Sequence, residues 1–169
     1  MNPPPGYVPT PLSTARKVVA DADIQPGQRV LEPSAGSGNL AAAIREAGVE
    51  PDVIEVNPDL RQLLALEGYQ VVGEDFLAFS PSESERYDRI VMNPPFDDRR
   101  DIKHVRHAFD VALAPGGRLA AIVSTSSIEG SGAQETAFRT WLDQHGADYA
   151  RLPEDTFAQS DVQKHVQTS

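Results

Sequence analysis

The sequence predicts an α/β protein in which helices cover both faces of a mainly parallel, doubly wound sheet of about six to seven strands. Two observations lead to this fold class. Short apolar runs alternate with segments of helical periodicity along the 169-residue chain, and strands that alternate with helices form parallel sheets with right-handed crossovers. The apolar runs are also continuous, as is typical of strands that are buried on both faces.

The first half of the chain contains three strand–helix units after an irregular start. Residues 1–11 are rich in proline and are expected to form an irregular arm, because proline cannot donate a backbone hydrogen bond. Gly48 and Gly68 follow runs of good helix formers and are expected to end the second and third helices. The expected helices are residues 12–22, 39–47 and 59–67, and the expected strands are residues 29–32, 52–56 and 70–72.

The second half continues the alternation after a polar linker at residues 80–86. Residues 124–132 are rich in glycine and serine, and we expect them to be mobile. The expected strands are residues 87–92, 118–123 and 149–152, and the expected helices are residues 102–113 and 134–144. Few residues then remain for a further strand, so we expect the last strand of the sheet to be shortened or missing.

Composition narrows the class of protein. The chain is 40% hydrophobic without a long apolar run, which indicates a soluble globular protein with no membrane span. No signal-peptide pattern opens the sequence. The absence of cysteine excludes disulfides and thiolate metal sites and fits a cytoplasmic protein. The histidines show no zinc-ligand spacing, so no metal site is expected.

The formal net charge of −10 is unfavourable for binding nucleic acid by itself, because duplex binding depends mainly on lysine and arginine at the phosphates. One local basic cluster follows residue 96; it comprises Arg99, Arg100, Lys103 and Arg106. Aspartates are interleaved with it, so the cluster is either a ligand-facing patch or the solvated start of a helix.

A turn of unusual chemistry follows the apolar strand at residues 87–92: Asn93-Pro94-Pro95-Phe96. The prolines prevent strand pairing and impose an extended geometry on the residues before them. The Asn93 side-chain oxygen and the Pro94 carbonyl could accept the two hydrogens of an exocyclic amine, which frees the nitrogen lone pair for attack. Phe96 could stack on an extruded base. The alternative is a plain proline-rich turn.

Further candidate residues lie at the ends of other strands. Gly36 and Gly38 stand between a strand and a helix, where glycines let the backbone approach a ligand. Glu55, after the second strand, is placed to bind ribose hydroxyls, and this holds for a nicotinamide dinucleotide as well. Asp75, after the third strand, could accept from an adenine amino group. Glu32 beside the glycines would repel a pyrophosphate and suits the ammonium and sulfonium groups of S-adenosylmethionine.

These motifs resemble those of class I S-adenosylmethionine-dependent methyltransferases with an Asn-Pro-Pro-aromatic motif, especially the DNA N6-adenine branch. The segment 31–38 resembles the cofactor loop of that Rossmann-like family, and residues 7–11 resemble the segment that closes over the methionine moiety. The resemblance implies catalytic roles for Asn93, Pro94, Pro95 and Phe96. The cofactor-binding residues that it implies are Tyr7, Pro9, Thr10, Glu32, Pro33, Ser34, Ala35, Gly36, Gly38, Asn39, Glu55, Val56, Asp75, Phe76 and Asn93.

The resemblance implies that residues 1–169 form one methyltransferase domain without a separate target-recognition domain. The expected acceptor is N6 of adenine in DNA, presented as a flipped or single-stranded base, with a partner subunit for target recognition. Guanine N2 in RNA, a glutamine side chain in protein, and a catalytically silent cofactor-binding module remain alternatives. A nicotinamide oxidoreductase is the third class.

Overall fold

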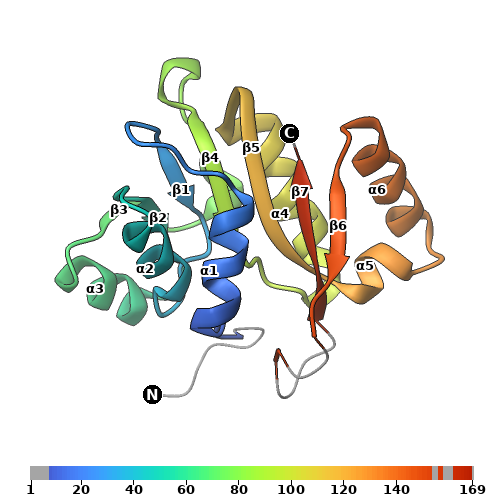
Figure 1. The fold of residues 1–169 in the computed structure, drawn as a ribbon, viewed down its shortest axis with the longest axis horizontal. Helices are drawn as coiled ribbons and strands as arrows, with labels where there is room; N and C mark the ends of the chain where they lie inside the picture. Colours follow the sequence, from blue (N-terminus) through green and yellow to red (C-terminus); the bar gives the residue numbers. More distant parts are fainter. Residues whose placement is uncertain (1–7, 154–155, 158–161, 169) are drawn as a thin grey trace.

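The computed structural model describes residues 8–153, residues 156 and 157, and the backbone of residues 162–168. Its centre is a seven-stranded sheet with the order β3-β2-β1-β4-β5-β7-β6, in which β7 alone is antiparallel to its neighbours (Figure 1). The strands are β1 Val30–Glu32, β2 Asp52–Ile54, β3 Gln70–Gly73, β4 Tyr87–Met92, β5 Leu113–Ser124, β6 Asp148–Arg151 and β7 Val162–Thr168. This arrangement confirms the predicted doubly wound α/β fold.

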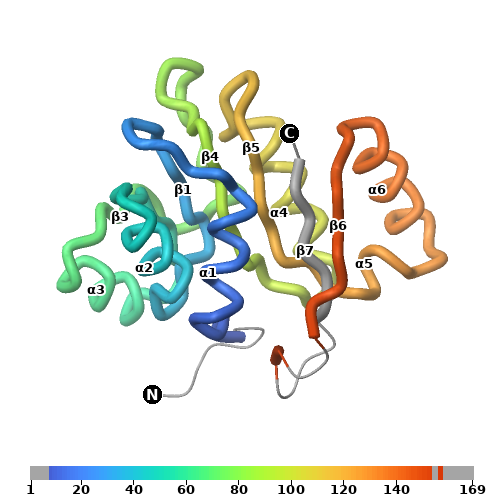
Figure 2. The backbone as a smooth tube through the Cα atoms, in the orientation of Figure 1, coloured from blue at the N-terminus to red at the C-terminus, as the bar shows by residue number. Residues whose placement is uncertain are grey.

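Helices cover both faces of this sheet. One face packs against α1 Leu12–Asp21, α2 Asn39–Glu46 and α3 Pro58–Leu66. The other face packs against α4 Arg100–His107, α5 Thr125–Glu129 and α6 Ala133–Gln144. Figure 2 follows the chain as it moves from the β1–β3 side to the β6 side of the sheet.

Alternation within each strand distributes its side chains between the two apolar layers. In β4, Ile90 and Met92 join the cluster under α4 and α6, whereas Val91 joins the cluster under α1 and α2. All three side chains are fully buried, as are Leu119 and Ile122 of the neighbouring strand. The continuous apolar runs of the sequence thus correspond to strands that are buried on both sides.

The expectation of a shortened or missing last strand is wrong. Residues 162–168 form β7, which pairs along its length with β5, from Leu119↔Thr168 to Ser124↔Val162, and with β6. A strand rises about 3.3 Å per residue, so the seven residues of β7 are long enough to pair with the end of β5.

The region between β5 and α6 is also more ordered than the sequence suggested. Residues 124–132 were expected to be mobile, but they include α5, whose Ser127 and Ile128 are buried. Ser124 caps this helix by accepting a hydrogen bond from the Ser127 backbone N–H. In this segment a serine caps the helix, and glycines allow close packing.

Smaller differences concern element ends. The helix expected at residues 102–113 begins earlier, at Arg100, and continues after His107 as one π-helical turn, Ala108–Ala112. In the described part of the chain no helix is both long and apolar enough to cross a bilayer.

Candidate functional site

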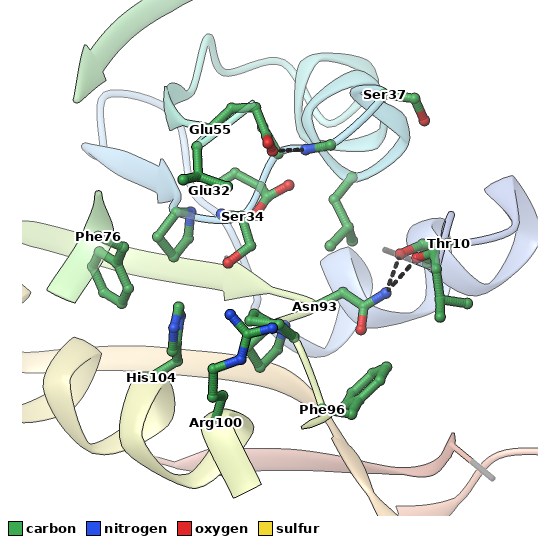
Figure 3. Close-up of a pocket in the computed structure, with 18 of the residues that line it drawn as sticks. Thr10, Glu32, Ser34, Ser37, Glu55, Phe76, Asn93, Phe96, Arg100 and His104 are labelled. Atoms are coloured by element: carbon green, nitrogen blue, oxygen red, sulfur yellow. Dashed lines mark hydrogen bonds between the residues drawn. The ribbon is translucent and has the colours of Figure 1, made fainter. Parts of the chain in front are cut away.

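One cavity lies at the carboxyl ends of the parallel strands, where the strand order reverses between β1 and β4, which is the usual ligand position in such sheets (Figure 3). The predicted site residues that line it are Pro9, Thr10, Glu32, Pro33, Ser34, Ala35, Gly36, Asn39, Glu55, Val56, Asp75, Phe76, Asn93, Pro94, Pro95 and Phe96. Tyr7 lies outside the described residues. Gly38 is placed behind the loop, where a Cβ atom would meet Leu64 at 3.2 Å.

The Asn93 amide is held by the arm at residues 8–11. Its Nδ2 donates to the Thr10 hydroxyl at 2.8 Å and to the Val8 carbonyl at 3.3 Å. A carbonyl can only accept, so the nitrogen must face the arm. The Asn93 Oδ1 is then buried without a hydrogen-bond partner, in a residue that lines the cavity. An acceptor oxygen in this state fits a ligand that donates a hydrogen bond.

Glu32 is the most deeply buried acid of the cavity, with none of its surface exposed. Its Oε1 accepts from the Ser34 backbone N–H at 2.8 Å, whereas its Oε2 has no partner. Burial, with a smaller contribution from the nearby charge of Glu55, raises the pKa of Glu32 to about 8. The expected negative charge beside the glycine loop is therefore absent at neutral pH unless a cation enters the cavity.

Glu55 is buried as well, but both of its oxygens have partners. Oε2 accepts from the Gly36 N–H at 2.7 Å and Oε1 accepts from the Asn57 N–H at 2.8 Å. Each carboxylate oxygen can accept a second hydrogen bond. Glu55 therefore fixes the glycine loop and keeps lone pairs available for a ligand.

Two residues of α4 line the cavity opposite Glu32 and Glu55, and the sequence analysis did not predict them as site residues (Figure 3). His104 lies against the Phe76 ring, with 5.7 Å between ring centroids, and its Nδ1 has no partner. Burial, helped by the charges of Arg100 and His107, lowers the pKa of His104 to about 4, so its ring is neutral. The Arg100 Nε is likewise buried without a partner.

The other cavity-lining residues that the sequence analysis missed come from segments next to the predicted ones; they are Val8, Ser37, Leu40, Glu74 and Leu77. For these residues the only available signal was their position beside a predicted neighbour. For Arg100 and His104 it was their spacing of four residues on a helix that directly follows the Asn93–Phe96 turn.

Two of the four cations in the basic cluster after Phe96 form ion pairs within the protein. Arg99 pairs with Glu135 and Arg100 pairs with Asp97, each at 2.5 Å, and Arg106 lies over the Trp141 ring at 5.5 Å. Lys103 is exposed. Within the described residues no group of acids and histidines could hold a metal ion.

The known proteins to which the chain is similar are methyltransferases. No family model matches the chain. It is 37% identical over 95 residues to a type II methyltransferase of Thermus thermophilus, covering 54% of this chain and 21% of that protein. It is 29% identical over 104 residues to a probable ribosomal RNA small subunit methyltransferase A of Methanosarcina mazei, covering 57% and 37%. The matched segments thus span about a fifth of the first relative and more than a third of the second.

Solved structures share the fold at low identity. The methyltransferase subunit of a type I restriction-modification system from Streptococcus thermophilus matches 96% of this chain and 44% of its own, with a TM-score of 0.77 and 21% identity. The glycopeptide N-methyltransferase MtfA, solved with S-adenosyl-L-methionine, matches 94% and 86%, with a TM-score of 0.63 and 16% identity. The chain therefore has the Rossmann-like fold of S-adenosylmethionine-dependent methyltransferases.

Proposed function

We propose that the chain binds S-adenosylmethionine in this cavity and transfers the methyl group to an exocyclic amine, with N6 of adenine in DNA as the leading acceptor. The observation that carries the proposal is the state of Asn93. Its nitrogen is bound by Val8 and Thr10, and its oxygen is buried without a partner beside Pro94. A group held in this way can accept a hydrogen bond from an amine and cannot donate one to it.

The residues on the opposite side of the cavity fit the cofactor. The buried Oε2 of Glu32 lacks a partner and suits an ammonium group, which would also stabilise the ionised carboxylate. Glu55 retains lone pairs for ribose hydroxyls, and Asp75 at the end of β3 is placed for the adenine amino group. When bound, S-adenosylmethionine supplies an electrophilic methyl group, and these residues fix its position.

The reaction needs positioning more than acid–base chemistry. Asn93 and the Pro94 carbonyl orient the acceptor amine, and Phe96 lies where it can stack on the base. The amine forms a bond to the methyl carbon as the bond from that carbon to sulfur breaks, and the amine then loses its proton. No residue with a pKa near neutrality is required for this step.

Adenine in DNA leads among the acceptors because the similar proteins include a type II methyltransferase and a restriction-modification methyltransferase subunit. A base in RNA is the second candidate, favoured by the resemblance to a probable ribosomal RNA methyltransferase. The net charge of −10 and the internal pairing of Arg99 and Arg100 favour target recognition by a partner subunit.

Replacing Asn93 by alanine tests the central assignment. We expect Asn93→Ala to lose most methyl transfer and to retain its affinity for S-adenosylmethionine, because Asn93 acts on the acceptor. Calorimetry measures the affinity, and incorporation of a radiolabelled methyl group measures turnover. A parallel loss of affinity and turnover would contradict the assignment.

The acceptor and the competing classes can be separated with the wild-type protein. Undermethylated genomic DNA, ribosomal RNA and a protein extract are offered in parallel with labelled S-adenosylmethionine, and DNA is expected to take up most label. Thermal-shift titration with S-adenosylmethionine and with NAD identifies the cofactor. Cofactor binding without label on any acceptor would favour a silent binding module, and a response to NAD alone would favour an oxidoreductase.

A further inference from the structure

The segment that follows the Asn93–Phe96 turn has an unusual backbone. Asp98 and Arg99 both have positive φ angles, 51° and 58°, although neither is glycine. Left-handed backbone at such residues persists only where neighbouring groups hold it in place. The next residue, Arg100, lines the cavity, so the conformation of this pair sets one wall of the candidate site.

The neighbouring group is a glutamate of α6. The Arg99 Nε donates to the Glu135 Oε1 at 2.5 Å, and Glu135 is only 8% exposed although it carries a charge. The hydrogen bond from Arg99 lowers the pKa of Glu135, so the carboxylate is ionised at neutral pH. Glu135 is not among the residues that line the cavity.

The loop between α5 and α6 is shaped around this glutamate. A Cβ atom at Gly132 would clash with the Glu135 Oε2, and one at Gly130 would lie 2.8 Å from its Cγ. The Arg139 Nη1 donates to the Ile128 and Gly130 carbonyls at 2.8 and 2.6 Å, which fixes the same loop. The absence of two side chains therefore gives Glu135 the room in which it reaches Arg99.

A second contact holds the same segment from β5 and α5. Asp101 is fully buried, and it accepts from the Ser124 N–H and the Ser127 hydroxyl, each at 2.8 Å. This contact anchors the start of α4. The Arg99–Glu135 pair acts two residues earlier, at the strained backbone itself.

We infer that Glu135 is a positioning residue for the acceptor side of the site. Through Arg99 it holds the Asp98–Arg99 backbone, and with it Arg100 and the end of the Asn93–Phe96 turn, in the geometry that receives the acceptor. The inference rests on the proposed function, because an acceptor side exists only if this cavity transfers a group.

Two variants and a matched control test the inference. Glu135→Gln keeps the shape of the side chain and removes its charge, whereas Gly132→Ala keeps the charge and displaces the carboxylate. Gly132 has an ordinary extended backbone, so alanine is compatible with it. Glu129→Gln serves as the control, because Glu129 of α5 pairs with Arg151 of β6 at 2.7 Å in a more exposed position.

The first readout is amide hydrogen exchange of residues 97–101, which needs no acceptor. Both test variants should exchange roughly tenfold faster there than the wild type and the control. The second readout is steady-state methylation of undermethylated genomic DNA, in which both variants should lose roughly tenfold in kcat/KM for DNA. Their dissociation constants for S-adenosylmethionine should stay within about twofold of the wild type.

Unchanged exchange at residues 97–101 in Glu135→Gln and Gly132→Ala would overturn the inference. Faster exchange with unchanged DNA kinetics would also overturn it, because the pair would then be only structural. A parallel loss of cofactor affinity would do the same. Failure of the wild type to methylate any acceptor would instead count against the proposed function, and it would be seen before the variants are compared.

Discussion

At the scale of single residues, the candidate site brings together several buried polar atoms that have no hydrogen-bond partner. Glu32 Oε2, Asn93 Oδ1 and His104 Nδ1 are buried without a partner and belong to residues that line one cavity. A buried polar atom without a hydrogen bond costs about 1–3 kcal/mol, and proteins rarely keep several together. Ligand atoms are the natural partners for them.

Sequence reasoning found two of these residues and missed the third for a physical reason. Glu32 ends β1 and Asn93 directly follows β4. Because the carboxyl ends of parallel strands share one edge of the sheet, the positions of both residues could be predicted from the sequence. His104 lies on a helix, and its orientation depends on how α4 packs against Phe76 and β5. No local pattern specifies that packing.

The raised pKa of Glu32 predicts a pH-dependent stability. The pKa in the folded protein is about 8, above the ordinary value of 4.5, so the stabilisation from the neutral carboxyl is complete below pH 4.5 and is lost as the pH rises towards 8. The glutamine in Glu32→Gln does not ionise. Between about pH 5 and pH 8, the wild-type Tm should therefore fall by at least ~2–4 °C relative to that variant.

Thermal melts of both proteins across this pH range measure the effect. Glu83→Gln is the control, because Glu83 is exposed, and its Tm should follow that of the wild type at every pH. A constant difference between wild type and Glu32→Gln from pH 5 to pH 8 would mean that Glu32 titrates with an ordinary pKa.

Replacing Glu55 by alanine is expected to weaken cofactor binding. In Glu55→Ala the ribose hydroxyls would lose their acceptor, and the Gly36 and Asn57 amides would lose theirs. The affinity for S-adenosylmethionine should fall by about 1.5–3 kcal/mol, the value of hydrogen bonds to a charged group. Calorimetry measures it, with Glu74→Ala as control, since Glu74 also lines the cavity but is mostly exposed. Equal affinities of the two variants would contradict the role of Glu55.

At the scale of elements, the arm before α1 connects the Asn93–Phe96 turn to the start of α2 through hydrogen bonds. It binds Asn93 through Thr10 and Val8, and the Thr10 carbonyl accepts from the Asn39 Nδ2 at the start of α2, at 2.7 Å. The sequence predicted an irregular arm near the cofactor, because proline excludes regular structure. It did not predict that the arm orients the Asn93 amide, since that contact joins residues 83 positions apart.

This contact gives a prediction for Thr10→Val, a variant of nearly the same shape without the hydroxyl. Loss of a hydrogen bond worth about 0.5–1.5 kcal/mol should lower methyl transfer by roughly 3–10-fold, because the Asn93 amide is then free to turn. Cofactor affinity should change less than turnover does, and the Tm should fall by about 1–6 °C, as expected for the loss of one such hydrogen bond. Radiolabel incorporation is the measurement, and Thr140→Val is the control, since the Thr140 hydroxyl bonds only within α6. Unchanged turnover would show that Asn93 needs no support from the arm.

At the scale of the whole molecule, topology and charge have different consequences. The strand order brings Glu32, Glu55, Asp75 and Asn93 to one edge, and that arrangement was predictable from the alternation of strands and helices. The charge distribution was not predictable to the same degree. The sequence shows a basic cluster after Phe96, but in the folded chain two of its four cations pair with acids, in the contacts Arg99–Glu135 and Arg100–Asp97.

Without a partner subunit, the chain is expected to bind duplex DNA weakly. Each phosphate contact contributes about −0.9 to the slope of log K against log salt for a duplex. With a net charge of −10 and these arginines paired internally, the chain should make few such contacts. We therefore expect a slope no steeper than about −3 in binding titrations between 50 and 200 mM salt. We also expect faster methylation of single-stranded than of duplex DNA, because flipping a paired base costs a few kcal/mol and weak binding of the duplex does not offset that cost.

The exposed Lys103 provides an internal check, since Lys103→Gln should make the slope shallower by about one unit if that residue contacts a phosphate. A slope near −6 for the wild type, with equal rates on the two forms of DNA, would show that the chain recognises duplex DNA without a partner subunit.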